Sequence, residues 1–326
     1  MPAPARGRDG RRRVASRSSP HGVPTMHDTP RHVRFGPVTV HFGHQQGKYP
    51  DGNQVIVRGA DALAVFDSPR VAERIGPEFD DADLAILGHV HEDHVAGLHR
   101  IPRAAVHVHA ADVEAARSWA GLSRHYGYPP EVLEPLLEHI EREFSYAPRP
   151  DAIAYDDGAR WDLGGGTAVH AVHLPGHTAG HCALLVEPVG VAFIGDIDLS
   201  GFGPYYGDAT SDLGALRRSL ARVAELPASV WVTSHHKGVY TDRDAFLAAL
   251  RAFTATIDAR EARLLAMLGE APRALDELVR MRLLYPPGYA ALWRDFAERR
   301  TIGFHLDELR AAGRVRRLDD GRWQRV

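Results

Sequence analysis

The sequence predicts a mixed α/β fold for most of the chain and a smaller, separate module at its C-terminal end. Short apolar runs typical of strands recur between residues 38 and 232, and several lead directly into loops that carry histidine or aspartate. Amphipathic helical segments alternate with these runs. The chain has 326 residues, enough for one large domain and a small one. We divide it into a tail at 1–33, a main domain at 34–255 and a C-terminal module at 256–326.

Residues 1–33 are predicted to form a disordered basic tail. They are rich in Arg, Pro, Gly and Ser and almost free of large apolar side chains, so they cannot offset the entropy lost on ordering. The basic cluster at 11–13 is not followed by the apolar core that an export signal needs. The single cysteine, Cys182, permits no internal disulfide and lies in an apolar run, where we expect a core residue. These features favour a cytoplasmic protein.

The main domain is expected to begin as a series of strands. Apolar or alternating runs predict strands at 38–42, 54–57, 63–67, 83–87 and 105–109, with a loop at 47–53 and a brief helix at 71–75. Helices are predicted at 111–119 and 130–144, and this segment could form a lid over a site. Further strands are predicted at 161–173, 182–194 and 230–232, and further helices at 212–223 and 241–267. Ser211 or Asp212 is the expected N-cap of the first of these helices.

The C-terminal module is predicted from helices that are followed by a hairpin. Helical patterns occupy 272–284 and 301–312, and the breaker Pro286-Pro287-Gly288 lies between them. The sequence Asp319-Asp320-Gly321 between the runs 315–318 and 322–326 is a strong hairpin signal. Helices followed by a basic hairpin resemble a winged-helix fold. We expect the module to pack on the main domain and to help wall a pocket there.

The densest chemical signal lies directly after the predicted strand at 83–87. His89, His91, Asp93 and His94 fall within six residues, and a strand that leads into such a loop places several side chains around one point. Imidazole nitrogen and carboxylate oxygen suit Zn²⁺ and, with less selectivity, Fe or Mn. The predicted strand ends farther along the chain offer three more donors, on His177, Asp196 and His235. This set is large enough for two metal ions and a bridging water.

Four motifs in this order resemble those of the metallo-β-lactamase superfamily. Residues 89–94 fit its H-x-H-x-D-H motif, and 174–181 resemble its P-G-H-T-x-G loop. Residues 194–196 resemble its apolar-Gly-Asp turn, and 233–235 resemble its late strand that ends in histidine. The resemblance covers roughly residues 35–255. It implies a four-layer αββα sandwich, to which the small winged-helix-like domain would be appended.

The resemblance also implies a role for each donor in a site for two divalent metal ions, with Zn²⁺ preferred and Fe or Mn as alternatives. One metal would take His89, His91 and His177, the other would take Asp93, His94 and His235, and Asp196 would bridge them. His236 directly follows His235 and stays open as an alternative ligand. Water held by two metals becomes hydroxide near neutral pH, and Asp93 could act catalytically by orienting this nucleophile and taking its proton.

Other polar residues near the motifs are candidates for binding substrate or for structural roles. Four that follow ligand-bearing turns could stabilise a developing oxyanion: Tyr205, Tyr206, His236 and Lys237. Glu92 is expected to face solvent or the pocket rather than a metal, and His181 is expected to be structural. Thr178 and Gly180 are expected to shape the turn that aims His177.

The function favoured by these observations is hydrolysis of a small-molecule thioester, ester or lactone by a metal-bound hydroxide. The net charge of −3 gives no global case for nucleic acid or an anionic membrane, and no apolar run reaches the roughly 20 residues of a membrane helix. The second motif and the C-terminal module resemble those of hydroxyacylglutathione-hydrolase-like proteins, although no clear basic pattern for glutathione is present. A small molecule is the expected partner, and a homodimer is compatible with the sequence.

Alternative functions stay open. An endoribonuclease could use the module as a nucleic-acid contact, because its end carries Arg314, Arg316, Arg317, Arg322 and Arg325. Acidic residues interleave with these arginines, which argues against a phosphate-binding surface. A mononuclear-iron sulfur dioxygenase would use only half of the donors, and the presence of His94 and His235 argues against it. A regulator without enzymatic activity would not need the complete donor set.

Overall fold

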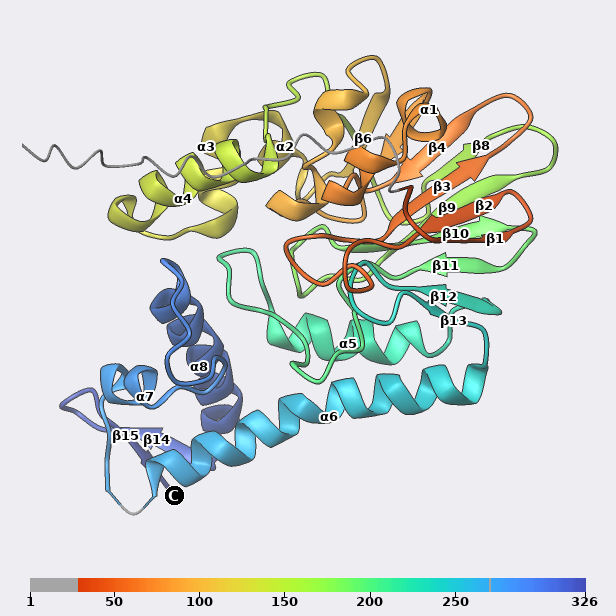
Figure 1. Ribbon diagram of the computed structural model, residues 1–326. Helices are drawn as coiled ribbons and strands as arrows, with labels where there is room; N and C mark the ends of the chain where they lie inside the picture. Colours follow the sequence, from red (N-terminus) through yellow and green to blue (C-terminus); the bar gives the residue numbers. More distant parts are fainter. Residues whose placement is uncertain (1–28, 270) are drawn as a thin grey trace, which may run out of the picture.

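Two β-sheets packed face to face form the centre of the protein, with helices on both outer faces (Figure 1). The computed structural model describes residues 29–269 and 271–326. A cluster of apolar side chains fills the space between the sheets, and two further clusters lie between each sheet and its helices. The four layers confirm the predicted αββα architecture of the main domain.

The first sheet has seven strands in sequence order. They are β1 (His32–Phe35), β2 (Val38–His41), β3 (Gln54–Arg58), β4 (Leu63–Phe66), β5 (Leu84–Ile86), β6 (Ala105–His109) and β7 (Ile153–Tyr155). The strands β1 to β4 pair antiparallel, whereas β4 to β7 pair parallel. Alternate residues of β3 serve different layers: Val55 and Val57 face the second sheet, and Ile56 faces the outer helices. Both faces of this sheet are therefore buried.

The second sheet has six strands in the order β13-β12-β11-β10-β9-β8. They are β8 (Arg160–Asp162), β9 (Ala168–His173), β10 (Cys182–Glu187), β11 (Val191–Phe193), β12 (Val230–Val232) and β13 (Val239–Tyr240). Neighbouring strands pair antiparallel except β11 and β12, which are parallel. Cys182 on β10 faces the core between the sheets, where burial raises the pKa of its thiol to about 12. It is therefore the core residue that its apolar surroundings predicted.

Helices cover the outer faces of both sheets. The first sheet is covered by α1 (Pro77–Asp80), α2 (Val113–Arg117), α3 (Trp119–Tyr126) and α4 (Pro130–Phe144), with short 3-10 turns at Arg70–Arg74, Glu92–His94 and Leu98–Arg100. The second sheet is covered by α5 (Leu213–Val223) and the long α6 (Arg243–Leu268). Asp212 caps α5 by accepting a hydrogen bond from the Ala215 N–H at 2.6 Å, as the sequence predicted. The Trp231 ring stacks on Phe246 at 4.3 Å and anchors α6.

The C-terminal module is joined to the main domain by the continuous helix α6. The N-terminal part of α6 packs on the second sheet. The last turns of α6 pack with α7 (Leu275–Met281), α8 (Arg294–Ala311) and the hairpin of β14 (Val315–Arg317) and β15 (Trp323–Arg325). The predicted boundary at residues 255–256 thus falls inside one helix. Figure 1 shows the module at the end of α6 that projects beyond the second sheet.

Several predicted elements have different limits in the structure. The predicted strand 161–173 is two strands, because Gly164, Gly165 and Gly166 all adopt positive φ angles and turn the chain between β8 and β9. The predicted strand 182–194 is likewise divided into β10 and β11 by a turn at 188–190. Strand β1 begins at His32, inside the segment assigned to the tail, because it pairs with β2. The rest of the predicted tail, 1–28, lies outside the described residues.

Within the described residues, no helix combines the length and the apolar character that a membrane-crossing segment requires.

Candidate metal centre

Four loops bring the predicted donors to one edge of the sandwich. The loop after β5 carries the donors of residues 89–94, and the β9–β10 connection carries His177. Asp196 follows β11 and His235 follows β12. Because β11 and β12 are parallel neighbours, their carboxyl ends lie at the same edge, and the loops after them meet there. All seven predicted donors lie in this region, and we call them the His/Asp cluster.

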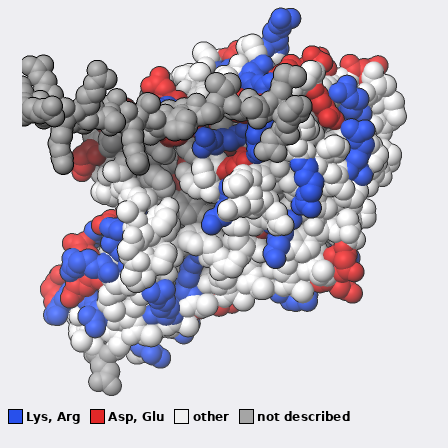
Figure 2. Space-filling model, in the orientation of Figure 1, with Lys and Arg blue, Asp and Glu red and all other residues white. Residues whose placement is uncertain are grey.

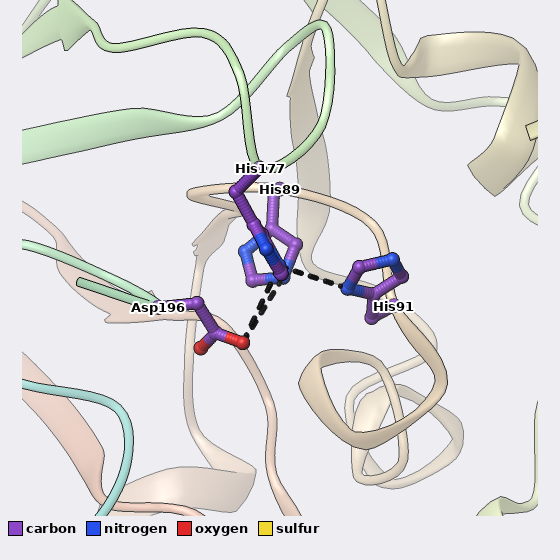
Figure 3. Close-up of side chains that lie close together, drawn as sticks. All are labelled: His89, His91, His177 and Asp196. Atoms are coloured by element: carbon purple, nitrogen blue, oxygen red, sulfur yellow. Dashed lines mark hydrogen bonds and ion pairs between the residues drawn. The ribbon is translucent and has the colours of Figure 1, made fainter. Parts of the chain in front are cut away.

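The first group within the cluster contains three imidazoles and one carboxylate (Figure 3). The Nε2 atom of His177 lies 3.2 Å from Nε2 of His89 and 3.1 Å from Nδ1 of His91. Asp196 Oδ2 lies 3.4 Å from Nε2 of His177 and 3.9 Å from Nε2 of His89. Nitrogen and oxygen donors that converge in this way suit a borderline cation such as Zn²⁺.

The second group contains Asp93, His94 and His235. Asp93 Oδ2 lies 3.1 Å from Nε2 of His235, and its Oδ1 lies 3.8 Å from Nε2 of His94. All three side chains are nearly inaccessible to solvent. Their donor atoms therefore converge in a region where few hydrogen bonds to water can offset the free-energy cost of their burial.

Asp196 faces both groups with different oxygens. Its Oδ2 points to His89 and His177, whereas its Oδ1 lies 3.0 Å from Nε2 of His94 and 3.4 Å from Nε2 of His235. Asp196 Oδ1 and His94 Nε2 are both buried and have no aligned hydrogen-bond partner among the described residues. Buried donors that lack partners but converge on one point fit two cations that share one carboxylate.

The other ring nitrogen of most cluster histidines is held by a buried acceptor. Nδ1 of His94 lies 2.7 Å from Asp67 Oδ2, and Nδ1 of His235 lies 2.8 Å from the Gly47 carbonyl. Nδ1 of His177 lies 2.9 Å from the carbonyl of Tyr205. A proton held on Nδ1 leaves Nε2 as a lone pair that faces the cluster, so these contacts orient the rings for metal binding.

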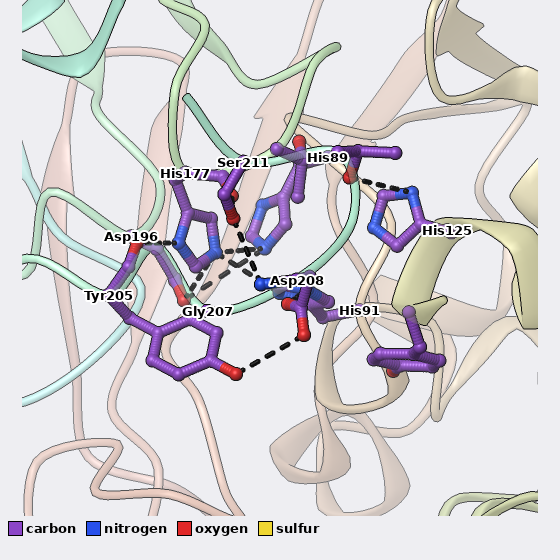
Figure 4. A network of polar contacts seen from close by, with 12 residues as sticks. His89, His91, His125, His177, Asp196, Tyr205, Gly207, Asp208 and Ser211 are labelled. Carbon is purple, nitrogen blue, oxygen red and sulfur yellow. Dashed lines mark hydrogen bonds and ion pairs between the residues drawn. The ribbon is translucent and has the colours of Figure 1, made fainter. Parts of the chain in front are cut away.

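Asp208 is a further residue beside the cluster that no sequence motif indicates. Its Oδ2 lies 3.0 Å from Nε2 of His91, which leaves the Nδ1 atom of that ring facing the cluster (Figure 4). Its Oδ1 accepts hydrogen bonds from the hydroxyls of Tyr128 and Tyr205, and its N–H donates to Ser211 Oγ at 3.2 Å. Asp208 follows the Gly-rich loop without any motif, so only the fold reveals its contact with His91.

Charge attraction dominates the electrostatics of the cluster. Burial alone would lower the pKa of His235, but the nearby carboxylates of Asp196 and Asp93 outweigh it and raise that pKa to about 10. Burial would raise the pKa of Asp196, but His94 and His235 hold it well below its usual range. In contrast, burial and the neighbouring His94 lower the pKa of His89. The carboxylates thus carry the negative charge that a bound cation would neutralise.

The turn that carries His177 is fixed by Asp112. This buried carboxylate accepts hydrogen bonds from Thr178 Oγ1 at 2.6 Å and from the Gly180 N–H at 2.8 Å. A Cβ atom on Gly180 would lie 2.6 Å from the Asp112 carboxyl carbon, so only glycine permits this approach. Thr178 and Gly180 therefore shape the turn as the sequence predicted.

His181 has a structural role in the same region. Its Nε2 accepts a hydrogen bond from the Asp196 N–H at 3.1 Å, and its Nδ1 faces the Leu174 carbonyl at 3.2 Å. Burial lowers the pKa of His181 to about 3, which keeps the ring neutral. A neutral ring can serve both contacts at once, and it fixes the backbone from which Asp196 projects.

A pocket of about 510 Å³ opens above the His/Asp cluster. Aromatic side chains from both the main domain and the C-terminal module make up much of its wall. Besides five residues of the cluster (His91, Asp93, His177, Asp196, His235) it is lined by Lys48, Tyr49, Glu92, Tyr126, Tyr128, Leu136, Asp198, Ser200, Phe202, Tyr205, Asp208, His236, Tyr285, Pro286, Tyr289 and Trp293. A cavity of this size accommodates a small molecule next to the cluster.

Two of the four predicted substrate-binding residues lie in the pocket and two do not. Tyr205 and His236 line it. Tyr206 is fully buried with its hydroxyl 2.8 Å from Nε2 of His305, because consecutive residues of this extended loop point in opposite directions. Lys237 is exposed and is not part of the pocket lining, because the turn after β12 directs it to the surface. Tyr206 and Lys237 thus lie outside the pocket lining, and contact of Tyr205 or His236 with substrate stays a prediction.

Glu92 lines the pocket beside the cluster. Its carboxylate accepts hydrogen bonds from the hydroxyls of Tyr49, at 3.0 Å, and Tyr126. These bonds tie the loop 47–53 and helix α3 to the motif loop. Glu92 therefore faces the pocket, as the sequence predicted.

Comparison with known proteins gives the same picture as the geometry. No curated protein matches the chain significantly. Among solved structures, a metallo-beta-lactamase family protein from Thermus thermophilus is 26% identical with a TM-score of 0.63, and the match covers 91% of this chain and 97% of that one. A beta-lactamase domain protein from Burkholderia ambifaria is 19% identical with a TM-score of 0.64, over 94% and 96% of the two chains. Both matches extend over most of this chain, well beyond the four motifs.

The sequence pattern of the Metallo-beta-lactamase superfamily matches residues 51–235. This span includes every residue of the His/Asp cluster and more than half of the chain. The motifs, the αββα layers and the convergent donors all agree with this match, so the chain belongs to the metallo-beta-lactamase superfamily.

Proposed function

We propose that this protein is a metal-dependent hydrolase of a small-molecule thioester, ester or lactone. The observation that carries the proposal is the position of the His/Asp cluster, whose two groups of donors share Asp196 next to a pocket of small-molecule size. The proposal accounts for the complete donor set, which a binding protein without catalysis would not need.

The residues of the cluster would hold two divalent cations. His89, His91 and His177 form one site, Asp93, His94 and His235 form the other, and Asp196 serves both. Imidazole and carboxylate donors favour Zn²⁺, with Fe or Mn as alternatives. When bound, such ions act as Lewis acids and make water a nucleophile near neutral pH.

The protein's own residues would position the reactants and move the proton. In hydrolysis, a water oxygen forms a bond to the carbonyl carbon, and the bond from this carbon to sulfur or oxygen breaks. The products are a carboxylate, a proton and a thiol or alcohol. Asp93 lines the pocket with a carboxylate that can take the proton from water, and the His236 ring is a nearby donor for the carbonyl oxygen. The Tyr205 hydroxyl could donate there only after leaving Asp208 Oδ1, which accepts its proton at 3.2 Å.

The endoribonuclease alternative receives less support from the module. Arg314 contacts the Glu261 carboxylate, Arg322 lies 2.7 Å from Asp320, and Arg317 lies over the Trp323 ring. These partners compete with phosphate for the same guanidinium groups. Figure 2 shows Lys and Arg mixed with Asp and Glu at the end of the molecule that carries the module. A surface with both signs offers weak attraction for RNA.

The sulfur dioxygenase alternative, with one iron, would require only one group of donors. The presence of Asp93, His94 and His235 at close range supports two metals instead. We also propose that the module is winged-helix-like. Support comes from its helices, its hairpin, and a bridge between Arg273 and Trp323 that extends the hairpin to a third segment.

A substrate panel with matched variants tests the proposed function. Zn²⁺-loaded protein would be assayed with a thioester, an ester, a lactone, a phosphodiester and a short RNA, alongside Asp93→Ala. As a control, Asp162→Ala removes an exposed carboxylate on β8. We expect hydrolysis of a carbonyl substrate that is lost in Asp93→Ala and kept in the control. Cleavage of RNA alone, or equal activity in Asp93→Ala, would overturn the proposal.

A further inference from the structure

One side of the pocket is built from aromatic rings rather than polar groups. We call Tyr205, Tyr285, Tyr289 and Trp293 the aromatic wall. All four residues line the pocket, and Tyr205 and Trp293 pack against Tyr285. The rings of Tyr285 and Tyr289 stack in parallel at 4.6 Å with an angle of 3° between them. Three of the four residues come from the C-terminal module, whose described residues contribute no charged side chain to the pocket.

A buried carboxylate fixes the segment that carries Tyr285. Glu298 on α8 is fully inaccessible to solvent, and it accepts hydrogen bonds from the N–H groups of Leu283, Leu284 and Tyr285 at 2.8–3.1 Å. Three backbone donors on one carboxylate restrict the segment to one conformation. The Tyr285 ring is therefore presented to the pocket by a rigid support.

A second set of contacts ties the module to the loops around the cluster. Arg300 on α8 donates hydrogen bonds to the carbonyls of Tyr126 and Gly127, and its guanidinium lies over the Tyr128 ring. Arg260 on α6 donates to the carbonyls of Phe202 and Pro204 at 2.6 and 2.5 Å. These arginines hold both flanks of the pocket against the module, so the position of the wall relative to the cluster is defined.

The chemistry of the lining discriminates between classes of substrate. Lys48 is the only Lys or Arg among the described residues that line the pocket. A leaving group with several carboxylates, such as glutathione, would find few cationic partners there. In contrast, Tyr289 is 37% exposed although it stacks on Tyr285, so apolar ring surface remains in contact with water. Covering such a surface with an apolar group is favourable.

We propose that the substrate carries a flat aromatic group next to the scissile carbonyl and that this group lies against the aromatic wall. The inference rests on the proposed function, because it specifies the substrate of the same site. The wall binds the aromatic acyl group, and the cluster lies at the carbonyl end. The C-terminal module is then the part of the chain that selects the substrate.

A pair of thioesters that differ only in the acyl group tests this inference. The S-acetyl and S-(2-naphthoyl) thioesters of N-acetylcysteamine would be compared with Zn²⁺-loaded protein, Tyr289→Ala and Leu292→Ala. We expect kcat/KM for the naphthoyl substrate to exceed that for the acetyl substrate by about tenfold or more, from apolar burial and ring stacking. Tyr289→Ala should lower this ratio by about threefold to tenfold, mainly through KM. Leu292 is an exposed apolar residue of the same segment outside the pocket lining, so Leu292→Ala should leave the ratio unchanged.

Binding of the product separates this inference from the proposed function. Calorimetry would compare 2-naphthoate with acetate on the same three proteins. Preferential binding of naphthoate that is weakened in Tyr289→Ala supports the wall even if no thioester is hydrolysed. Hydrolysis of both thioesters at equal rates, or equal binding of both carboxylates, would overturn the inference while leaving the hydrolase proposal intact. If the ratio of kcat/KM for the two thioesters changed equally in Tyr289→Ala and Leu292→Ala, the inference would also be overturned. The effect would then not be specific to a residue of the aromatic wall.

Discussion

The His/Asp cluster and the aromatic wall line the same pocket but are built in different ways. The cluster comes from short loops at strand ends, and most of its histidines are oriented by a buried acceptor close by, as Asp67 orients His94. The wall joins Tyr205 of the main domain to Tyr285 of the module, and it is held by Glu298 on a third segment. The cluster is polar and nearly dry, whereas the wall is aromatic and partly exposed.

We infer from this difference that the His/Asp cluster carries out the reaction and that the aromatic wall selects the substrate. Donors at strand ends are placed by the sandwich itself, so their arrangement depends on the fold of the main domain and on the loops after its strands. The wall depends on packing between two domains, and we expect that its three residues from the module can change without disturbing the cluster. Substitutions in the two regions should therefore have separable effects on metal content and on substrate preference.

The largest effect is expected from Asp196→Asn. Both oxygens of Asp196 face imidazoles of the two groups, so the variant loses the negative charge and presents an NH2 group to one of the two groups. We expect bound metal to fall by one ion or more per chain and kcat/KM to fall on the order of a thousandfold. Elemental analysis and the thioester assay measure both quantities, with Asp162→Asn as the control on exposed β8. Full metal content in Asp196→Asn would show that the charge of Asp196 is not needed to hold the metal ions.

A second substitution, Glu298→Ala, should affect the wall and spare the cluster. Three backbone N–H groups would lose their acceptor, at a cost of about 3 kcal/mol in the free energy of unfolding. We expect unchanged metal content and a lower ratio of naphthoyl to acetyl hydrolysis. Chemical denaturation and the paired thioester assay test this, with Asp307→Ala on the exposed face of α8 as the control. A loss of metal in Glu298→Ala would mean that the two regions are not separable.

The same contrast explains what the sequence could predict. The motif at 89–94 is local, so its donors and the fold that presents them were recognisable from residue order. Asp208 and Glu298 act through contacts with residues far away in the chain, and no spacing marks them. Tyr205 and Tyr206 could not be distinguished, since only the path of the loop decides which ring faces the pocket. The winged-helix interpretation and the individual ligand roles stay predictions.

A smaller effect is expected from Asp208→Asn. The Asp208 carboxylate contacts Nε2 of His91, so the variant keeps the shape but loses the charge that supports this ring. We expect a tenfold to hundredfold loss of metal affinity, equivalent to about 1.4–2.7 kcal/mol. Competition with a chelator measures the affinity. If only KM changes and the affinity for metal is kept, Asp208 belongs to the pocket rather than to the support of the cluster.

The smallest effect concerns a contact between the main domain and the C-terminal module, where the Tyr206 hydroxyl lies 2.8 Å from Nε2 of His305. Burial lowers the pKa of His305 to about 3, assisted by the positive charges of Arg260 and Arg217 and opposed by Asp258. The side chains of Glu261 and Glu308 also approach this ring. The folded protein therefore excludes a proton that the unfolded chain binds below about pH 6.5. The stability from neutral His305 is present above that pH and is lost as the pH falls towards 3.

Chemical denaturation of the protein and of His305→Gln at pH 7.5 and 5.5 tests this contribution. Other buried histidines such as His181 titrate in both proteins, so the difference between the two isolates His305. Between these pH values the unmodified protein should lose about 1.4 kcal/mol more than the variant, one pH unit below the unfolded pKa. Equal losses would show that His305 takes up a proton without unfolding. The contact between Tyr206 and His305 would then tolerate a charged imidazole in the folded protein. This contact would not fix the module, and the part of the aromatic wall that the module carries, relative to the His/Asp cluster.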